Sequence, residues 1–129
     1  KFNLRIACPK KYSPNKKILS WAKHNKVNLI VTMKPDEAVK GSDCVMTDKW
    51  VSMNDKVNKK AKKKILKPFQ VNKKLMSKAH ADAIFMHCLP VGRGEEVTDD
   101  IIDGKQSVVW RQALNRVHAQ KSIIKWCLD

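Results

Sequence analysis

The sequence predicts an α/β fold with three layers, in which a parallel sheet of about five strands has helices on both faces. Short, continuous apolar runs recur along the chain, and segments with helical periodicity or helix-capping residues separate them. Continuous apolar strands that alternate with helices are typical of parallel sheets, because each crossover must return the chain to the same end of the sheet. The length of 129 residues, 43% of them hydrophobic, suits one core. We therefore expect residues 1–129 to form a single domain.

The first strand and helix follow from local residue types. Residues 3–8 form a β-rich run that Pro9 ends. Ser13 and Pro14 then offer an N-cap and a first-turn proline, so we expect a helix to begin there. Further apolar runs predict strands at residues 28–32, 44–48, 83–86 and 107–110.

The helices between these strands are predicted from caps and spacing. A short helix at residues 35–40 ends at Gly41, and Asn72 can cap another. A long closing helix follows the last strand, and its predicted inward face consists of Ala113, Val117, Ile124 and Leu128.

The densest positive charge lies in residues 55–67, DKVNKKAKKKILK. Val57, Ala61 and Ile65 recur there at a spacing of four, which indicates one face of a helix that Asn54 can cap. The lysines are then most simply the solvated sides of an amphipathic helix.

Composition limits the classes of function. A formal net charge of +15 would suit a nucleic-acid binder, but no nucleic-acid motif accompanies it and aromatic residues make up only 6%. Four cysteines lie far apart, with no C-x-x-C pair and no secretory leader, which favours reduced thiols, a cytoplasmic location and no zinc site. No apolar run approaches the about 20 residues of a membrane span. Because the first residue is Lys1, we expect the chain to be part of a longer protein.

Ligands bind beyond the carboxyl ends of the strands in such sheets, so the loops there are candidate sites. Residues 48–53, DKWVSM, follow the third expected strand, and residues 87–94, HCLPVGRG, follow the fourth. The second loop places a histidine, a thiol and a proline directly after a strand. These two loops are therefore rich in side chains that can take part in chemistry.

Four segments together resemble the ornithine carbamoyltransferase family. They are TDKWVSM (47–53), FQVN (69–72), MHCLPVGRGEEVTDDIIDG (86–104) and ALNRVHA (113–119), and they run in order over nearly the whole chain. The related aspartate enzymes lack the cysteine–leucine pair, and the putrescine enzymes lack the Ser-Met loop. The resemblance therefore implies the C-terminal, ornithine-binding half of such an enzyme, with a Rossmann-like fold.

The resemblance also implies which residues bind the substrates. Ornithine would contact Asp48, Ser52 and Met53. Carbamoyl phosphate would contact Cys88, Leu89 and Arg116, and Cys88 would be the catalytic residue. A carboxylate suits the ornithine ammonium group, and a guanidinium offers paired donors to a phosphate.

Other residues near the motifs are expected to have structural roles. His87 is predicted to be a structural histidine, and Arg93 with Glu95 and Glu96 to organise the loop. The remaining cysteines are expected in the core: Cys8, Cys44 and Cys127.

Two positions depart from the family pattern. Asn54 stands where the Ser-Met loop normally ends in glycine, and Asn is the residue other than glycine that best tolerates a positive φ. Leu114 replaces a glutamate, which would leave Arg116 less firmly oriented.

The implied reaction is attack by the side-chain amine of ornithine on carbamoyl phosphate, giving citrulline and phosphate without a metal or organic cofactor. The implied partners are the two substrates, an N-terminal carbamoyl phosphate-binding domain that residues 1–129 do not contain, and further copies in a homotrimer. A membrane partner is not expected. Two alternatives stay open: a domain that keeps the fold but serves only in assembly, and a basic binder of nucleic acid or an anionic surface.

Overall fold

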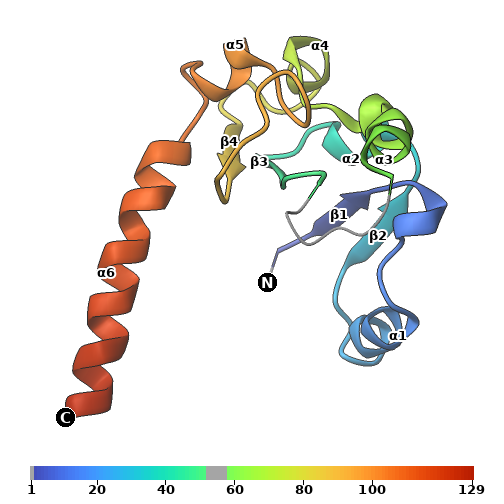
Figure 1. Ribbon diagram of the computed structural model, residues 1–129. Coiled ribbons are helices and arrows are strands. Elements are labelled where there is room, and N and C mark those ends of the chain that lie inside the picture. The colour runs from blue at the N-terminus through green and yellow to red at the C-terminus, as the bar shows by residue number, and fades with distance from the viewer. Residues whose placement is uncertain (1, 52–57) are drawn as a thin grey trace.

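A computed structural model describes residues 2–51 and 58–129, and it confirms the α/β class with parallel strands (Figure 1). The strands are β1 (Leu4–Ala7), β2 (Leu29–Thr32), β3 (Cys44–Thr47) and β4 (Ile84–His87). The α-helices are α1 (Lys16–His24), α2 (Pro35–Val39), α3 (Lys59–Leu66), α4 (Lys73–Met76), α5 (Asp99–Ile102) and α6 (Val109–Leu128). Two 3-10 helices, η1 (Lys10–Tyr12) and η2 (Lys67–Phe69), complete the described elements.

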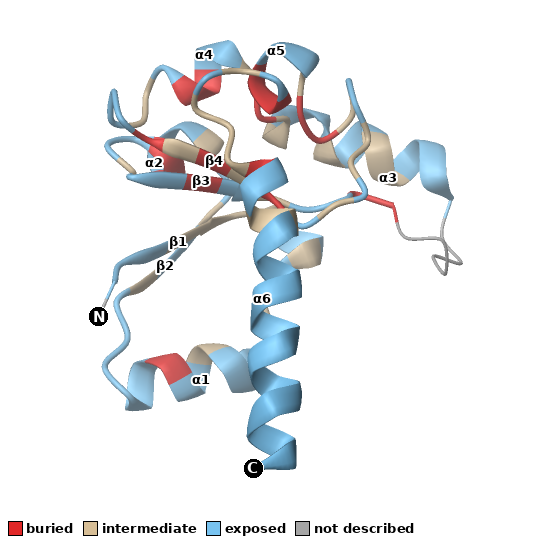
Figure 2. Cartoon of the chain, turned by 90° about the vertical axis from the view of Figure 1, so that its left-hand side faces the viewer, coloured by how far each residue is buried: buried red, intermediate tan, exposed pale blue. Residues whose placement is uncertain are grey.

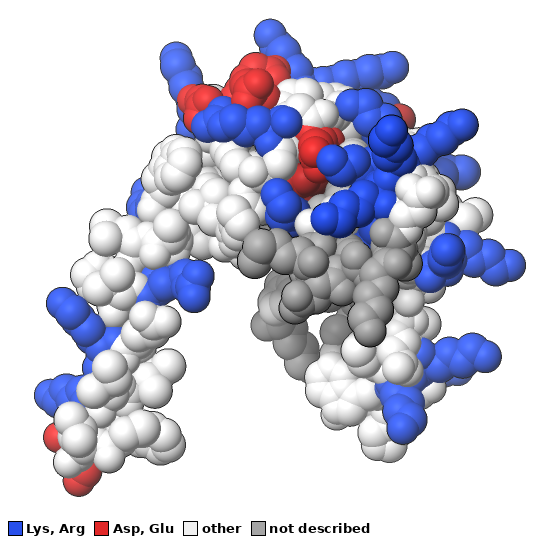
Figure 3. Space-filling view, in the orientation of Figure 1, with Lys and Arg blue, Asp and Glu red and all other residues white. Residues whose placement is uncertain are grey.

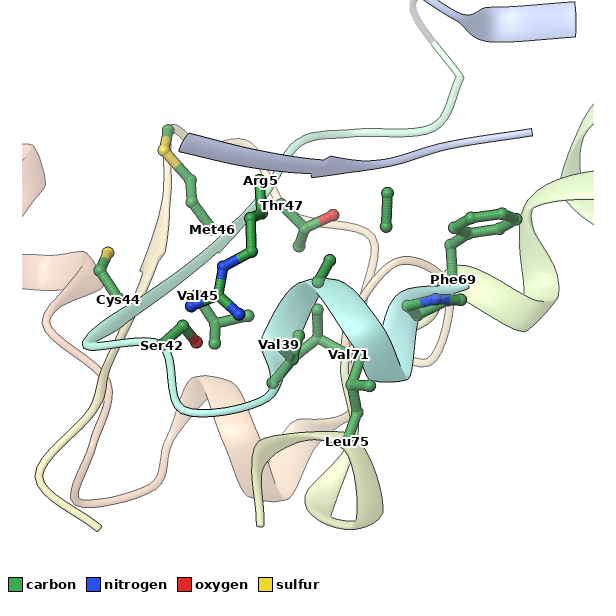
Figure 4. Close-up of a pocket in the computed structure, with 13 residues that line it drawn as sticks. Arg5, Val39, Ser42, Cys44, Val45, Met46, Thr47, Phe69, Val71 and Leu75 are labelled. Atoms are coloured by element: carbon green, nitrogen blue, oxygen red, sulfur yellow. The ribbon is translucent and has the colours of Figure 1, made fainter. Parts of the chain in front are cut away.

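The strands of the described residues form two parallel pairs, whereas the sequence predicts one sheet of about five strands. β1 pairs with β2, and β3 pairs with β4 so that Thr47 lies opposite His87. Between the two pairs, the Arg5 guanidinium donates to the carbonyl oxygen of Lys40 at 2.6 Å. Side chains from β1, α2 and β3 line a cavity of about 110 Å³ there, and Figure 4 shows Arg5 among them. This cavity and the Arg5 side chain take the place of direct pairing between β1 and β3.

The prediction of a fifth strand at residues 107–110 is wrong, because α6 already begins at Val109. Only Ser107 forms a parallel bridge, to Phe85 of β4. The N–H of Val108 donates to the carbonyl oxygen of Phe85 at 3.0 Å, and the chain then turns into the helix. Val109 is completely buried, so the helix starts where this side chain enters the core.

The core lies around β3 and β4, where Figure 2 shows the buried residues gathered beneath α4 and α5. Its members are apolar residues from both strands, four helices and the loops between them: Val39, Val45, Val71, Leu75, Met76, Phe85, Val97, Ile101, Ile102 and Val109. At a typical 1.5 to 3 kcal/mol for each large apolar side chain that leaves water, this cluster holds the ends of β3 and β4 in place.

Asparagine side chains cap three of the helices, and two of these caps differ from the prediction. Asn15, rather than Ser13, accepts a first-turn N–H of α1. Asn58 caps α3, so this helix begins later than predicted, and the expected cap Asn54 lies outside the described residues. Asn72 caps α4 as predicted. Asn is among the best N-cap residues because its side-chain oxygen reaches a backbone N–H that has no partner inside the helix.

The closing helix α6 forms as predicted, but the face expected to be inward is wrong. Ala113 is only partly buried, and Val117, Ile124 and Leu128 are 45%, 59% and 82% exposed. Figure 1 shows the reason, since α6 leaves β4 at its first turn and runs away from the strands. Among residues 2–51 and 58–129, no helix combines the length and the hydropathy needed to cross a membrane.

The prediction that three cysteines belong to the core is also wrong. Cys44 and Cys127 are exposed, and Cys8 is only partly buried. Side chains alternate between the two faces of a strand, so Cys44 shares an exposed face of β3 while Val45 points into the core. Cys127 lies in the last turn of α6, beyond the contacts that this helix makes with β4.

Candidate functional site

The candidate site begins where β3 and β4 end side by side. Asp48 follows Thr47 of β3, and Cys88 follows His87 of β4. Because Thr47 and His87 are register partners in a parallel pair, both loops leave the same edge of the sheet. The Cys88 thiol donates a hydrogen bond to Oδ1 of Asp48, with 3.0 Å between Sγ and Oδ1. Two residues that are 40 positions apart in the sequence thus meet at one point.

This contact shifts the pKa of both groups. The hydrogen bond from Cys88 is the main reason that the pKa of Asp48 lies below its usual value, and the backbone N–H of Lys49, which donates to Oδ1 at 2.6 Å, acts in the same direction. The hydrogen bond to Asp48, followed by burial and the charge of the carboxylate, raises the pKa of the Cys88 thiol. At neutral pH the site therefore holds a carboxylate beside a protonated thiol.

Arg116 acts on this site through the electrostatic effect of its charge on Cys88. It lies on the exposed part of α6, and its positive charge lowers the pKa of Cys88, against the larger effect of Asp48. Leu114 is 58% exposed two positions earlier. Side chains two apart on a helix point to different sides, so a residue at this position is not placed to orient Arg116 directly.

The turn after Cys88 fixes how the loop leaves the strand. Leu89 has a φ of +54°, and the peptide bond between Leu89 and Pro90 is cis. The N–H of Leu89 donates to Nδ1 of His87 at 2.9 Å, and the Leu89 side chain packs against the core. These contacts place Leu89 next to Cys88 and hold it there.

Beneath the turn lies a buried pair of polar side chains. His87 is 1% exposed and Glu96 is completely buried. Nδ1 of His87 accepts the N–H of Leu89, and its Nε2 lies 3.4 Å from Oε1 of Glu96. The same Oε1 accepts the N–H of Gly92. His87 and Glu96 thus tie both ends of the turn to the core, in line with the structural roles predicted for them.

Arg93 organises the far side of the loop, also as predicted. Its guanidinium makes paired hydrogen bonds with the carboxylate of Asp103, at 2.6 and 2.9 Å, and a further one with Asp99 at 2.9 Å. The hydrogen bonds from Arg93 lower the pKa of Asp103. Because these carboxylates lie at the two ends of α5, Arg93 fastens the loop to that helix.

Two glutamines that support the site escape prediction from the sequence. Oε1 of Gln112 on α6 accepts the backbone N–H of His87 at 3.1 Å. The side-chain amide of Gln70 donates to the carbonyl oxygens of Gly94 and Glu95, each at 2.7 Å. Gln70 belongs to the FQVN segment of the resemblance, but only the fold reveals which loop this segment supports.

Two of the predicted ornithine contacts, Ser52 and Met53, lie outside the described residues. The described chain leads up to them through Trp50 and Val51, which are 7% and 8% exposed. No three His, Cys, Asp or Glu side chains come together as metal ligands within residues 2–51 and 58–129.

Comparison with known families matches residues 1–127 to the aspartate/ornithine carbamoyltransferase, Asp/Orn binding domain. The chain belongs to this family. The ornithine carbamoyltransferase of Rhodopseudomonas palustris strain CGA009 is 57% identical over 127 residues, which are 98% of this chain and 41% of that protein. That of Bradyrhizobium diazoefficiens is 53% identical over 129 residues, or 42% of its length. The chain thus spans about two fifths of these curated relatives.

Solved structures of the carbamoyltransferase family have the same fold. The ornithine carbamoyltransferase of Pyrococcus furiosus superposes with a TM-score of 0.85 at 44% identity, over 95% of this chain and 40% of that one. The anabolic enzyme of Campylobacter jejuni gives 0.87 at 35% identity, over 97% of this chain and 43% of its own. These likenesses confirm the Rossmann-like fold that the resemblance implied.

Proposed function

We propose that this chain supplies the ornithine-binding half of an ornithine carbamoyltransferase, which transfers the carbamoyl group of carbamoyl phosphate to the side-chain amine of ornithine. The observation that carries the proposal is the hydrogen bond between Cys88 and Asp48 at the ends of two paired parallel strands. This hydrogen bond joins the two loops whose residues resemble the family. The chain is also 57% identical to a protein named ornithine carbamoyltransferase.

Asp48 is the group that receives ornithine. Its lowered pKa keeps it an anion at neutral pH, and its carboxylate is exposed at the edge of the sheet, so an ammonium group can reach it. The amine must lose a proton before it attacks. With a lysine-like pKa near 10.4, deprotonation at pH 7 costs about 4.6 kcal/mol, which the site has to offset by positioning and by removing the amine from water.

Cys88 acts as a neutral thiol beside the reacting nitrogen. Its raised pKa keeps the proton on sulfur at neutral pH, and a nucleophilic cysteine requires the thiolate. The carbamoyl group therefore passes directly from carbamoyl phosphate to the amine. The amine attacks the carbonyl carbon to give a tetrahedral intermediate, which then expels phosphate, so no covalent intermediate on Cys88 is needed.

Carbamoyl phosphate requires more cations than this part of the chain offers. We assign one guanidinium for the phosphate to Arg116, whose charge acts on Cys88, and further contacts with carbamoyl phosphate to Cys88 and Leu89. A dianion in a catalytic site needs several donors that converge on it. We assign the other donors to an N-terminal domain in the part of the protein that the curated relatives have and residues 1–129 lack.

The test is Asp48→Asn in the complete enzyme, with ornithine and carbamoyl phosphate each titrated by calorimetry. We expect ornithine binding to weaken by about 1.5 to 3 kcal/mol, the usual worth of a hydrogen bond to a charged group, and carbamoyl phosphate binding to change little. Asp43→Asn is the matched control, because the Asp43 side chain is 97% exposed and precedes the other end of β3. Equal weakening of the two substrates would contradict the assignment of Asp48.

A domain that serves only in assembly is the competing proposal. It predicts a folded complete protein that binds neither substrate, whereas the enzyme binds both. The same calorimetric titration of the wild-type protein distinguishes the two.

A further inference from the structure

A strongly basic surface lies beside the candidate site, and the carbamoyl transfer proposed above gives it no role. We define the lysine surface by the exposed lysines of η1, α3 and η2: Lys10, Lys11, Lys59, Lys60, Lys64 and Lys67. Figure 3 shows Lys and Arg side chains gathered over the part of the molecule where α3 lies. η1 and α3 adjoin, because Nζ of Lys62 lies 5.7 Å from the centre of the Tyr12 ring. The lysines of η1 therefore lie on an element that neighbours α3, and those of η2 directly follow α3 in the chain.

Contacts connect the lysine surface to the loop that carries Cys88. Lys63 of α3 forms an ion pair with Glu95. Gln70, directly after η2, holds the carbonyl oxygens of Gly94 and Glu95. The next residue, Glu96, contacts His87, the neighbour of Cys88. A short series of contacts thus leads from α3 to His87, the neighbour of Cys88.

Little negative charge offsets this surface. No Asp or Glu occurs in residues 1–35 or 58–81, the segments that contain η1, α3 and η2. Within residues 2–51 and 58–129, Glu95 contacts α3, and it is already paired with Lys63. The field of the lysine surface is therefore positive.

The lysines also occupy positions that do not favour the stability of α3. Lys59 and Lys60 lie in the first turn, and no acidic residue accompanies them. The N-terminal end of a helix carries partial positive charge, so cations there are unfavourable. Helix stability therefore does not explain the lysines in the first turn of α3. Attraction of an anion is a function that they can serve.

We propose that the lysine surface steers carbamoyl phosphate, a dianion, toward the site at Asp48 and Cys88, an inference that rests on the function proposed above. A surface of one charge sign raises the association rate of an oppositely charged ligand, and the effect falls steeply with ionic strength. At about 0.1 M salt the field still extends about 10 Å from the charges. Ornithine has a net charge of +1 at neutral pH, because its two ammonium groups outweigh its carboxylate, so the same field opposes its approach.

The experiment measures kcat/KM for each substrate in the complete enzyme as salt rises from low to moderate concentration. We expect kcat/KM for carbamoyl phosphate to fall with salt, and that for ornithine to stay level or rise. Replacing Lys59, Lys60 and Lys64 by Gln keeps helix propensity similar and removes three charges. This variant should lose about 3- to 10-fold in kcat/KM for carbamoyl phosphate at low salt, at the lower end of known steering effects, and should lose most of the salt dependence.

The matched control replaces Lys23, Lys121 and Lys125 by Gln, which removes the same charge from exposed positions on α1 and the far part of α6. It should keep the wild-type salt dependence. Equal effects of the two triple variants, or an α3 variant with unchanged salt dependence, would overturn the steering proposal while citrulline formation still upheld the enzyme function. A wild-type complete protein that forms no citrulline at any salt would overturn both.

Discussion

At the scale of single residues, the site depends on one hydrogen bond between a thiol and a carboxylate. Cys88 donates and Asp48 accepts, so each stabilises the other in the form that it has at neutral pH. The raised pKa of Cys88 means that this exposed thiol is less reactive than its exposure alone indicates, because alkylating reagents react with the thiolate. Asp48 raises the pKa of Cys88, and Arg116 lowers it.

This opposition gives a prediction about alkylation. The rate at which iodoacetamide modifies Cys88 should rise with pH through a midpoint above that of an ordinary thiol. In Asp48→Asn the hydrogen-bond acceptor loses its charge, so the midpoint should move to lower pH, and in Arg116→Gln it should move to higher pH. Mass spectrometry of the Cys88 peptide measures the rate, and the peptide of exposed Cys127 is the internal reference. Midpoints that stay the same in both variants would contradict the geometry of the site.

At the scale of elements, the loop after β4 is held by contacts of two kinds. Buried His87 and Glu96 fasten its inner side to the core, while the partly exposed pair of Lys63 and Glu95 fastens its outer side to α3. Burial makes the first kind far more sensitive to substitution, because a polar group left without its partner in the core cannot turn to water.

Substitution of the two neighbouring glutamates tests this difference. Glu96→Ala removes the acceptor for the Gly92 N–H and the carboxylate beside Nε2 of His87, so we expect a loss of about 1 to 3 kcal/mol in the free energy of unfolding. Glu95→Ala breaks only a partly exposed ion pair and should cost less than about 1 kcal/mol. Urea unfolding of the complete protein measures both. Comparable losses would show that Glu96 is not an anchor of the loop.

Sequence patterns predicted the helices and strands that local residues determine. They predicted less well the elements whose structure depends on tertiary contacts. Asn72 was identified as a cap because the cap acts within four residues, and the strand at residues 83–86 was identified from its continuous apolar run. Residues 107–110 were predicted as a strand in the same way, yet only Ser107 bridges to β4, and a helix begins at the buried Val109. The motif predicted Asp48 and Cys88 as site residues, but their distance depends on the register between β3 and β4, which no local pattern specifies.

At the scale of the whole molecule, large apolar side chains are exposed on α1 and α6. Three of the tryptophans illustrate this, since Trp21, Trp110 and Trp126 are 61%, 57% and 80% exposed. Trp21 lies on α1 and the other two on α6, the elements that Figure 2 shows mostly as exposed. Exposed apolar groups of this size usually mark a surface that another part of a protein covers.

The reaction itself should need more than residues 1–129. We predict that this polypeptide, purified alone, folds but forms no citrulline at saturating substrate concentrations. Folding requires the core around β3 and β4, which these residues contain. Turnover requires carbamoyl phosphate to be held within about 3 to 3.5 Å of the amine, and Arg116 alone leaves the dianion mostly in water. Adding a separately purified N-terminal domain should restore activity, and the same mixture made with Cys88→Ala should stay low. Citrulline formed by residues 1–129 alone, above the Cys88→Ala background, would mean that the phosphate-binding donors lie within this chain.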